Sequence, residues 1–148
     1  MMAAHIEMVD GVEVEITQEQ YEAMFPPVVR TIADVVAERE RRLALGFDYD
    51  FGDARGIHHI GTTPDDMRKW MDEVTPLAQA FINAGQPDGE ITIVTETGPV
   101  VVTAMEWQQI LLGAAAWRQP IYAASFVLQA MSPIPGDFTD EEWWQDDD

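Results

Sequence analysis

The stretch from residue 104 to residue 131 constrains the fold most, because it is the longest helical pattern in the chain. Its apolar residues recur at alternating spacings of three and four, which is the period of one helix face. These residues are Trp107, Ile110, Ala114, Trp117, Ile121, Ala124, Leu128 and Met131. The opposite side is also partly apolar, through Leu112, Ala116, Ala123 and Val127. A helix that is apolar nearly all round is buried, so we expect either the core helix or part of a large interface, bent at Pro120.

Short strand pairs are predicted ahead of this helix. Residues 5–16 alternate apolar and polar on both sides of Asp10-Gly11, a dipeptide typical of two-residue hairpin turns. Residues 47–51 alternate aromatic and acidic side chains, and residues 57–60 form the expected partner strand after a glycine-containing turn. A further hairpin is predicted over residues 90–102.

Three threonines mark helix starts. Thr17, Thr63 and Thr103 each stand three positions before a Gln, Asp or Glu, which is the pattern of a capping box. The helix after Thr63 is expected to run toward Asn83 and to be kinked or restarted at Pro76. The residues that we expect this helix to bury are Met67, Trp70, Met71 and Val74.

One more helix is predicted over residues 27–45. Pro27 suits its first position, and Gly46 suits the position after its end. Together the patterns predict an α+β fold. In it, two short β-hairpins or a small antiparallel sheet pack with three to four helices and a long, kinked C-terminal core helix. We expect an N-terminal hairpin and helical arm over residues 1–37, a main domain over 38–131 and an acidic tail over 132–148.

The charge balance narrows the classes of partner. The chain has 27 acidic and 8 basic residues, with a formal net charge of −19. Such a charge opposes contacts with nucleic-acid phosphates and with anionic membranes. A solvated acidic surface is the ordinary interpretation, and an acidic mimic of DNA is the alternative. The absence of cysteine removes disulfides and thiolate catalysis, and we expect neither a secretory signal nor a membrane-spanning helix.

His58 and His59 beside Asp48 and Asp50 form the best metal-binding pattern in the sequence. Adjacent strand residues point to opposite faces, however, so at most one imidazole joins the aspartates. No His-Glu-x-x-His motif or comparable spacing supports a metal site, and no Ser/His/Asp arrangement can be nominated. We therefore predict no catalytic, cofactor-binding or metal-binding residues, and a metal hydrolase that uses one of these histidines is the enzymatic alternative.

Two segments are candidates for partner binding. The first is the apolar helix that carries Val29, Ile32 and Val36. It packs either on the core of its own chain or on a copy of itself, in which case it would be the seam of a homo-oligomer. The second is the acidic tail, whose anchors are Phe138, Trp143 and Trp144. Paired tryptophans are costly to expose, so we expect the tail to dock on this protein or on a neighbour.

The order of these motifs is similar to a phage- and prophage-encoded family of domains of unknown function, numbered 4376, found in tail-fibre and tail-assembly regions. The resemblance spans about residues 38–131. The matching positions are Arg41, Arg42, Gly46, Phe47, Thr63, Thr103, Ala104 and Glu106. Val102 departs from the leucine that is usual in the family, and the Phe47–Asp53 hairpin and the Trp-Trp tail lie outside its general pattern. The resemblance implies no catalytic residues.

The resemblance implies a non-enzymatic structural protein of the phage tail region, at the tail, baseplate or fibre attachment. Its expected partners are other tail or fibre proteins, with neither nucleic acid nor membrane among them. Its expected location is the virion, after synthesis in the host cytoplasm. A tail-fibre assembly chaperone is the main alternative, and an acidic inhibitor of a DNA-binding host protein is a further one.

Overall fold

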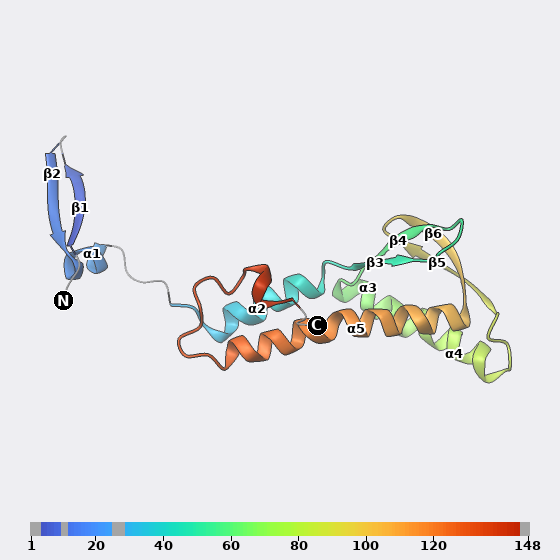
Figure 1. Ribbon diagram of the computed structural model, residues 1–148. Coiled ribbons are helices and arrows are strands. Elements are labelled where there is room, and N and C mark those ends of the chain that lie inside the picture. The colour runs from blue at the N-terminus through green and yellow to red at the C-terminus, as the bar shows by residue number, and fades with distance from the viewer. Residues whose placement is uncertain (1–3, 10–11, 25–28, 146–148) are drawn as a thin grey trace. The chain divides into compact units, whose positions relative to one another are not determined.

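The structure, a computed structural model, describes residues 4–9, 12–24 and 29–145, with side chains from 17–21, 23–24 and 29–145. The chain forms two compact units, Met1–Arg30 and Thr31–Asp148. Figure 1 shows their elements. The predicted N-terminal arm is thus divided between the units, and residues 132–145 of the acidic tail belong to the second.

The first unit is a hairpin followed by a short helix. Strand β1 (Ala4–Val9) pairs antiparallel with β2 (Val12–Thr17), and α1 follows over Gln18–Met24. The predicted turn at residues 10–11 lies outside the described residues. The predicted capping box is confirmed, because the Gln20 backbone N–H donates to Thr17 Oγ1 at 3.1 Å and the Thr17 N–H donates to Gln20 Oε1 at 2.9 Å.

Helix α5 (Ala104–Gln129) runs along the whole second unit in Figure 1. Thr103 caps it, since its side chain accepts from the Glu106 backbone N–H and the Glu106 side chain accepts from the Thr103 backbone N–H. Pro120 lies inside the helix, which continues beyond it. The N-terminal half of α5 packs with α4, and α2 packs along the C-terminal half.

Two antiparallel hairpins cover the N-terminal half of α5. One pairs β3 (Phe47–Asp50) with β4 (Ile57–Ile60), and the other pairs β5 (Glu90–Thr95) with β6 (Gly98–Thr103). His59 joins them, because its backbone N–H donates to Thr97 Oγ1 at 2.9 Å and its carbonyl accepts from the Glu96 N–H at 3.1 Å. Three two-stranded antiparallel sheets thus lie in the described residues, and the predicted α+β class is confirmed.

The predicted helix from Thr63 to Asn83 has three parts. They are α3 (Pro64–Lys69), a π-helical turn (Trp70–Val74) and α4 (Thr75–Asn83). The π turn precedes Pro76, whose missing N–H would otherwise leave a gap in the helix, so the predicted restart is confirmed. Trp70 and Val74 are buried as expected, but Met71 is 47 % exposed and the prediction for it was wrong.

Helix α2 spans Ile32–Leu43 and begins later than predicted. Thr31 caps it in a capping box with Asp34. Pro27, the predicted first residue, lies outside the described residues. A local cap that satisfies two backbone N–H groups decides the start of a helix more strongly than an apolar spacing that extends upstream. Val29 stands before the helix in a non-helical segment.

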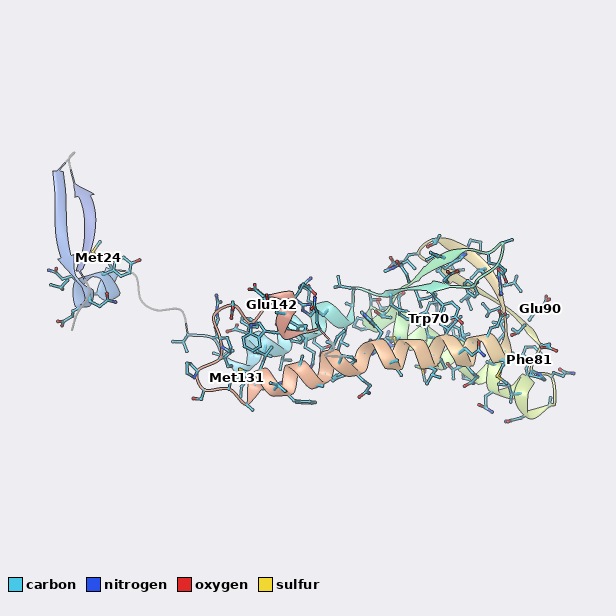
Figure 2. All side chains as sticks on the ribbon, viewed as in Figure 1. Met24, Trp70, Phe81, Glu90, Met131 and Glu142 are labelled. Carbon is cyan, nitrogen blue, oxygen red and sulfur yellow. The ribbon has the colours of Figure 1, made fainter. Side chains whose placement is uncertain are left out.

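The buried side chains of the second unit form two clusters around the two halves of α5. The first surrounds Trp70 and Trp107, whose ring centroids lie 5.1 Å apart, and Figure 2 shows Trp70 between α5 and the hairpins. The second cluster includes Val35 and Leu43 of α2, Ile121 and Leu128 of α5, and the tail residues Phe138 and Trp144.

Gly46 connects α2 to β3 and is required twice over. Its φ of +78° favours glycine, and a Cβ there would lie 2.5 Å from the Ile60 carbonyl oxygen and 2.6 Å from His59 Nε2. Gly52 has a similar φ of +74°, but a Cβ at that position would have no heavy atom within 4 Å. A side chain at either glycine would thus bear the strain of a positive φ, but only at Gly46 would it also meet neighbouring atoms.

We expect Gly46→Ala to reduce the free energy of unfolding by at least about 1 kcal/mol more than Gly52→Ala does. Both variants bear the strain of positive φ, but only the first pushes against a neighbouring backbone. Urea unfolding followed by circular dichroism measures the difference. Equal losses in the two variants would contradict the assignment of a close approach at Gly46.

Candidate partner-binding surfaces

The acidic tail is held against its own chain by Arg42. This buried guanidinium on α2 donates to Glu38 Oε1 at 2.9 Å, to Glu141 Oε1 at 2.9 Å and to the Thr139 carbonyl at 2.8 Å. The Cζ atom of the Arg42 guanidinium also lies 5.0 Å from the centre of the Trp144 ring, within the range of a cation–π contact. One side chain thus ties the last turn of α2 to three residues of the tail.

The predicted tail anchors are placed differently from one another. Phe138 and Trp144 are 5 % and 4 % exposed and pack in the cluster between α2 and α5. The Trp144 indole N–H donates to the Phe138 carbonyl at 2.7 Å, which closes the tail on itself. Trp143 is half-buried, and its indole donates to Asp137 Oδ1 at 3.1 Å. Figure 2 shows this part of the tail, marked by Glu142, beside α2.

The predicted residues of the N-terminal helix do not form one face. Val29 is 78 % exposed and lies ahead of the helix, Ile32 is 54 % exposed at its first turn, and Val36 is half-buried. Val35, which the sequence pattern did not single out, is the residue of this region that is fully buried against α5. Because the helix begins at Ile32, Val29 lies ahead of it, and partner binding by these three residues stays a prediction.

Four exposed large apolar residues lie on α5 and are not among the predicted partner-binding residues. Leu112 is 71 % exposed, Phe126 61 %, Val127 57 % and Met105 44 %. They lie on the side of the helix opposite Trp107, Ile110 and Leu128, which are fully buried. The helix is therefore apolar on both sides, and the described residues of the second unit cover one of them. The sequence signal for this exposed side was its partly apolar composition. That composition was equally compatible with burial in the chain's own core.

The two histidines of β4 have separate partners. His58 is buried, and its Nδ1 lies 2.8 Å from Thr95 Oγ1. His59 faces Asp48, with its Nδ1 2.8 Å from Asp48 Oδ1 and its Nε2 2.8 Å from the Leu45 carbonyl. The two rings thus do not meet the aspartates together. Within the described residues, no cluster of three or more His, Cys, Asp or Glu side chains could hold a metal ion.

The protonation of His59 follows from its partners. Both ring nitrogens face oxygen atoms that only accept hydrogen bonds, and an imidazole donates from both nitrogens only when it is charged. The hydrogen bond to Asp48, the hydrogen bond to Leu45 and the charge of Glu96 raise the pKa of His59 above its ordinary value of 6.5. The arrangement therefore favours the imidazolium form and ties β3 and β4 to the end of α2.

Arg55 ties the first hairpin to the start of α5. It donates to both carboxylate oxygens of Glu106, at 3.0 and 2.6 Å, and to the Val101 carbonyl at 3.0 Å. The bonds to Glu106 and to Asp53 raise the pKa of Arg55, and hydrogen bonds from Arg55 hold the pKa of Glu106 below its usual range. They also lower the pKa of Asp53 to about 2. Every group involved is thus charged at neutral pH and joins segments of the fold.

A family model described as "Domain of unknown function (DUF4376)" matches residues 26–143, which include α2, both hairpins of the second unit, α5 and most of the tail. No curated protein matches the chain, and no solved structure does. In the described part of the chain, no helix has the length and apolar character needed to cross a membrane.

We expect Arg42→Met to lower the free energy of unfolding by about 1–3 kcal/mol and to expose the tail to proteases. The change leaves Glu141 and the Thr139 carbonyl without their partner while keeping an apolar stem. Urea unfolding and limited proteolysis measure the two effects. Arg41→Met is the matched control, because Arg41 pairs with the same Glu38 but is 56 % exposed, and we expect it to cost less than about 1 kcal/mol. An equal effect in the control would show that Arg42 does not hold the tail.

The raised pKa of His59 predicts a pH-dependent stability. The stabilisation is fully present below the unfolded pKa of about 6.5 and is lost as pH rises through the higher folded pKa. We therefore expect the difference in unfolding free energy between the natural chain and His59→Gln to shrink from pH 6 toward pH 9. NMR titration of the ring gives the folded pKa, and Asp48→Asn should move it down. A pKa at or below 6.5 in the natural chain would contradict the assignment.

Proposed function

Since the chain belongs to this family of domains of unknown function, we propose that it is a non-enzymatic structural component of a phage tail region that acts through protein–protein contacts. The tail, baseplate or fibre attachment is its place in the virion. The motifs around Arg42, Thr63 and Thr103 resemble those of phage- and prophage-encoded tail-region domains, and this resemblance supports the viral context.

The observation that carries the proposal is the exposed apolar side of α5. The helix has 26 residues, of which only Glu106 and Arg118 are charged, in a chain with a net charge of −19. Exposed apolar patches bordered by polar residues mark sites of contact with other molecules. A surface of this kind suits a protein that works by assembly, with affinity from apolar contact and solubility from the acids elsewhere.

The distribution of charged pairs also supports a structural role. The groups with shifted pKa values in the described residues lie in ion pairs or charged hydrogen bonds, and those of His59 and Arg55 join separate elements. In many enzymes such groups converge in a cleft with a reacting molecule. Here Arg55 and Glu106 join a hairpin to α5, and His59 joins the other end of that hairpin to α2.

A tail-fibre assembly chaperone is the second candidate. The α5 side that the described residues of the second unit leave exposed would suit transient contact with an unassembled fibre as well as permanent contact in a virion. The two functions differ in whether the protein remains in the finished particle.

We expect mass spectrometry of purified virions, from a phage that carries the gene, to detect this chain in proportion to the other tail proteins. Virions from a phage that lacks the gene should have incomplete tails in electron micrographs. A chain that is absent from virions but needed for fibre assembly would establish the chaperone instead. A chain that is absent from virions and dispensable for tail assembly would overturn both.

A further inference from the structure

Eight exposed residues of α5 and its C-cap follow one another at alternating spacings of four and three. They are Met105, Gln109, Leu112, Ala116, Gln119, Ala123, Phe126 and Ala130, and we call them the α5 stripe. This spacing averages 3.5 residues, which is the heptad period of helices that pair along their length. The stripe lies opposite the buried face, so its period is not needed by the chain's own core.

We propose that the α5 stripe is the seam of a homodimer in which the α5 helices of two copies run antiparallel about a two-fold axis. The inference rests on the proposed function in one respect. That function is argued from the exposed apolar side of α5, and the inference names a second copy of the chain as the molecule that covers this side. A two-fold interface uses the same surface patch on both copies. If one residue of the first copy contacts a second residue of its partner, the same two residues also meet with the copies exchanged.

The side-chain sizes along the α5 stripe match this arrangement. With the axis between Ala116 and Gln119, every layer sets a larger side chain opposite a smaller one. The layers are Met105 with Ala130, Phe126 with Gln109, Leu112 with Ala123, and Gln119 with Ala116. A parallel pair in register would instead set Leu112 against Leu112 and Ala123 against Ala123, which alternates crowded layers with empty ones. The sequence of the stripe is therefore complementary to its own reverse.

The charges select a second copy rather than another kind of partner. A basic protein would be recognised through acids, but the α5 stripe contains no charged residue. Two copies with a net charge of −19 each repel one another, and an uncharged surface is where they approach at least cost. In the antiparallel pair, Glu106 lies across from Val127 of the other copy and not across from a second acid.

Two grooves border the middle of the α5 stripe. One, of about 310 Å³, is lined on its far side by Met67 and Met71 and reaches Gln119. The other, of about 400 Å³, lies toward the tail and is lined by Ala116, Pro120 and Trp144 among others. A ridge of side chains between two grooves is the form in which helices interlock. Because α5 is about 39 Å long and about 10 Å across, the contact is at the small end of specific interfaces, and we expect a dissociation constant in roughly the micromolar range.

The first test is the mass of the full chain in solution. Sedimentation equilibrium at concentrations from about 1 to 200 μM should give a mass that rises toward twice the 16.6 kDa of one chain. Leu112→Glu should raise the dissociation constant at least about tenfold, because each dimer buries two unpaired charges. Val94→Glu is the matched control, since Val94 is also exposed, at 60 %, but lies on β5, and it should leave the dissociation constant within about twofold. Circular dichroism should show both variants folded.

The second test fixes the direction of the helices. The natural chain has no cysteine, so any disulfide between copies must form at the single cysteine introduced in each variant. An oxidised mixture of Leu112→Cys and Ala123→Cys should give a disulfide-linked dimer, and neither variant alone should. In the antiparallel pair, two copies of residue 123 are about 16 Å apart along the axis, beyond the roughly 7 Å that a disulfide can span.

The proposal also fixes the effect of salt. Raising the ionic strength should tighten the dimer, because it screens the repulsion between two acidic copies. A monomeric mass at every concentration would overturn the proposal, and so would equal weakening by Val94→Glu, or a cross-link from Ala123→Cys alone that mixing with Leu112→Cys does not increase. Virion mass spectrometry tests the proposed function separately, so a monomer found in virions would reject the dimer and leave the tail-region function standing.

Discussion

The burial of one face of α5 is the constraint on which the rest of the second unit depends. A helix of 26 residues is about 39 Å long, and a single small core does not extend over that length. Each half therefore has a cover of its own. The hairpins and α4 pack over Trp107 and Ile110, whereas α2 and the tail pack over Ile121 and Leu128.

The scarce basic residues hold these covers in place. Arg42 ties α2 to the tail, Arg55 ties the first hairpin to the start of α5, and Arg118 of α5 reaches the Leu43 carbonyl at 3.4 Å at the end of α2. With 27 acids in the chain, Arg42 and Arg55 each find carboxylates at their junctions, and an arginine can serve several acceptors at once. Ion pairs of this kind contribute little at exposed sites. Their effect is larger where the guanidinium is buried, as it is for Arg42, which is why that residue and not Arg41 fixes the tail.

Local chemistry was predictable from the sequence, and long-range packing was not. The capping boxes at Thr17, Thr63 and Thr103 formed as predicted because each depends on residues three positions apart. The start of α2 was misplaced because an apolar spacing was followed upstream past the cap at Thr31. The contact between Arg42 and Glu141 joins residues 99 positions apart, and no local pattern specifies it. On α5 both sides are apolar. The spacing of the apolar residues identifies the two faces of the helix, but it does not tell which face the chain covers.

The division of charge over the surface bears on how such a protein finds its partners. A net charge of −19 makes copies repel one another and discourages indiscriminate apolar contact, so an exposed apolar face is tolerated only if it is narrow and selective. The α5 stripe meets both conditions, because it is one helix wide and its large and small side chains alternate from Leu112 to Ala130. Gln109 and Gln119 add polar positions within it, and such positions lower affinity while they fix register. Selectivity therefore comes from the order of side-chain sizes along the helix, and the surrounding acids exclude surfaces that do not match that order.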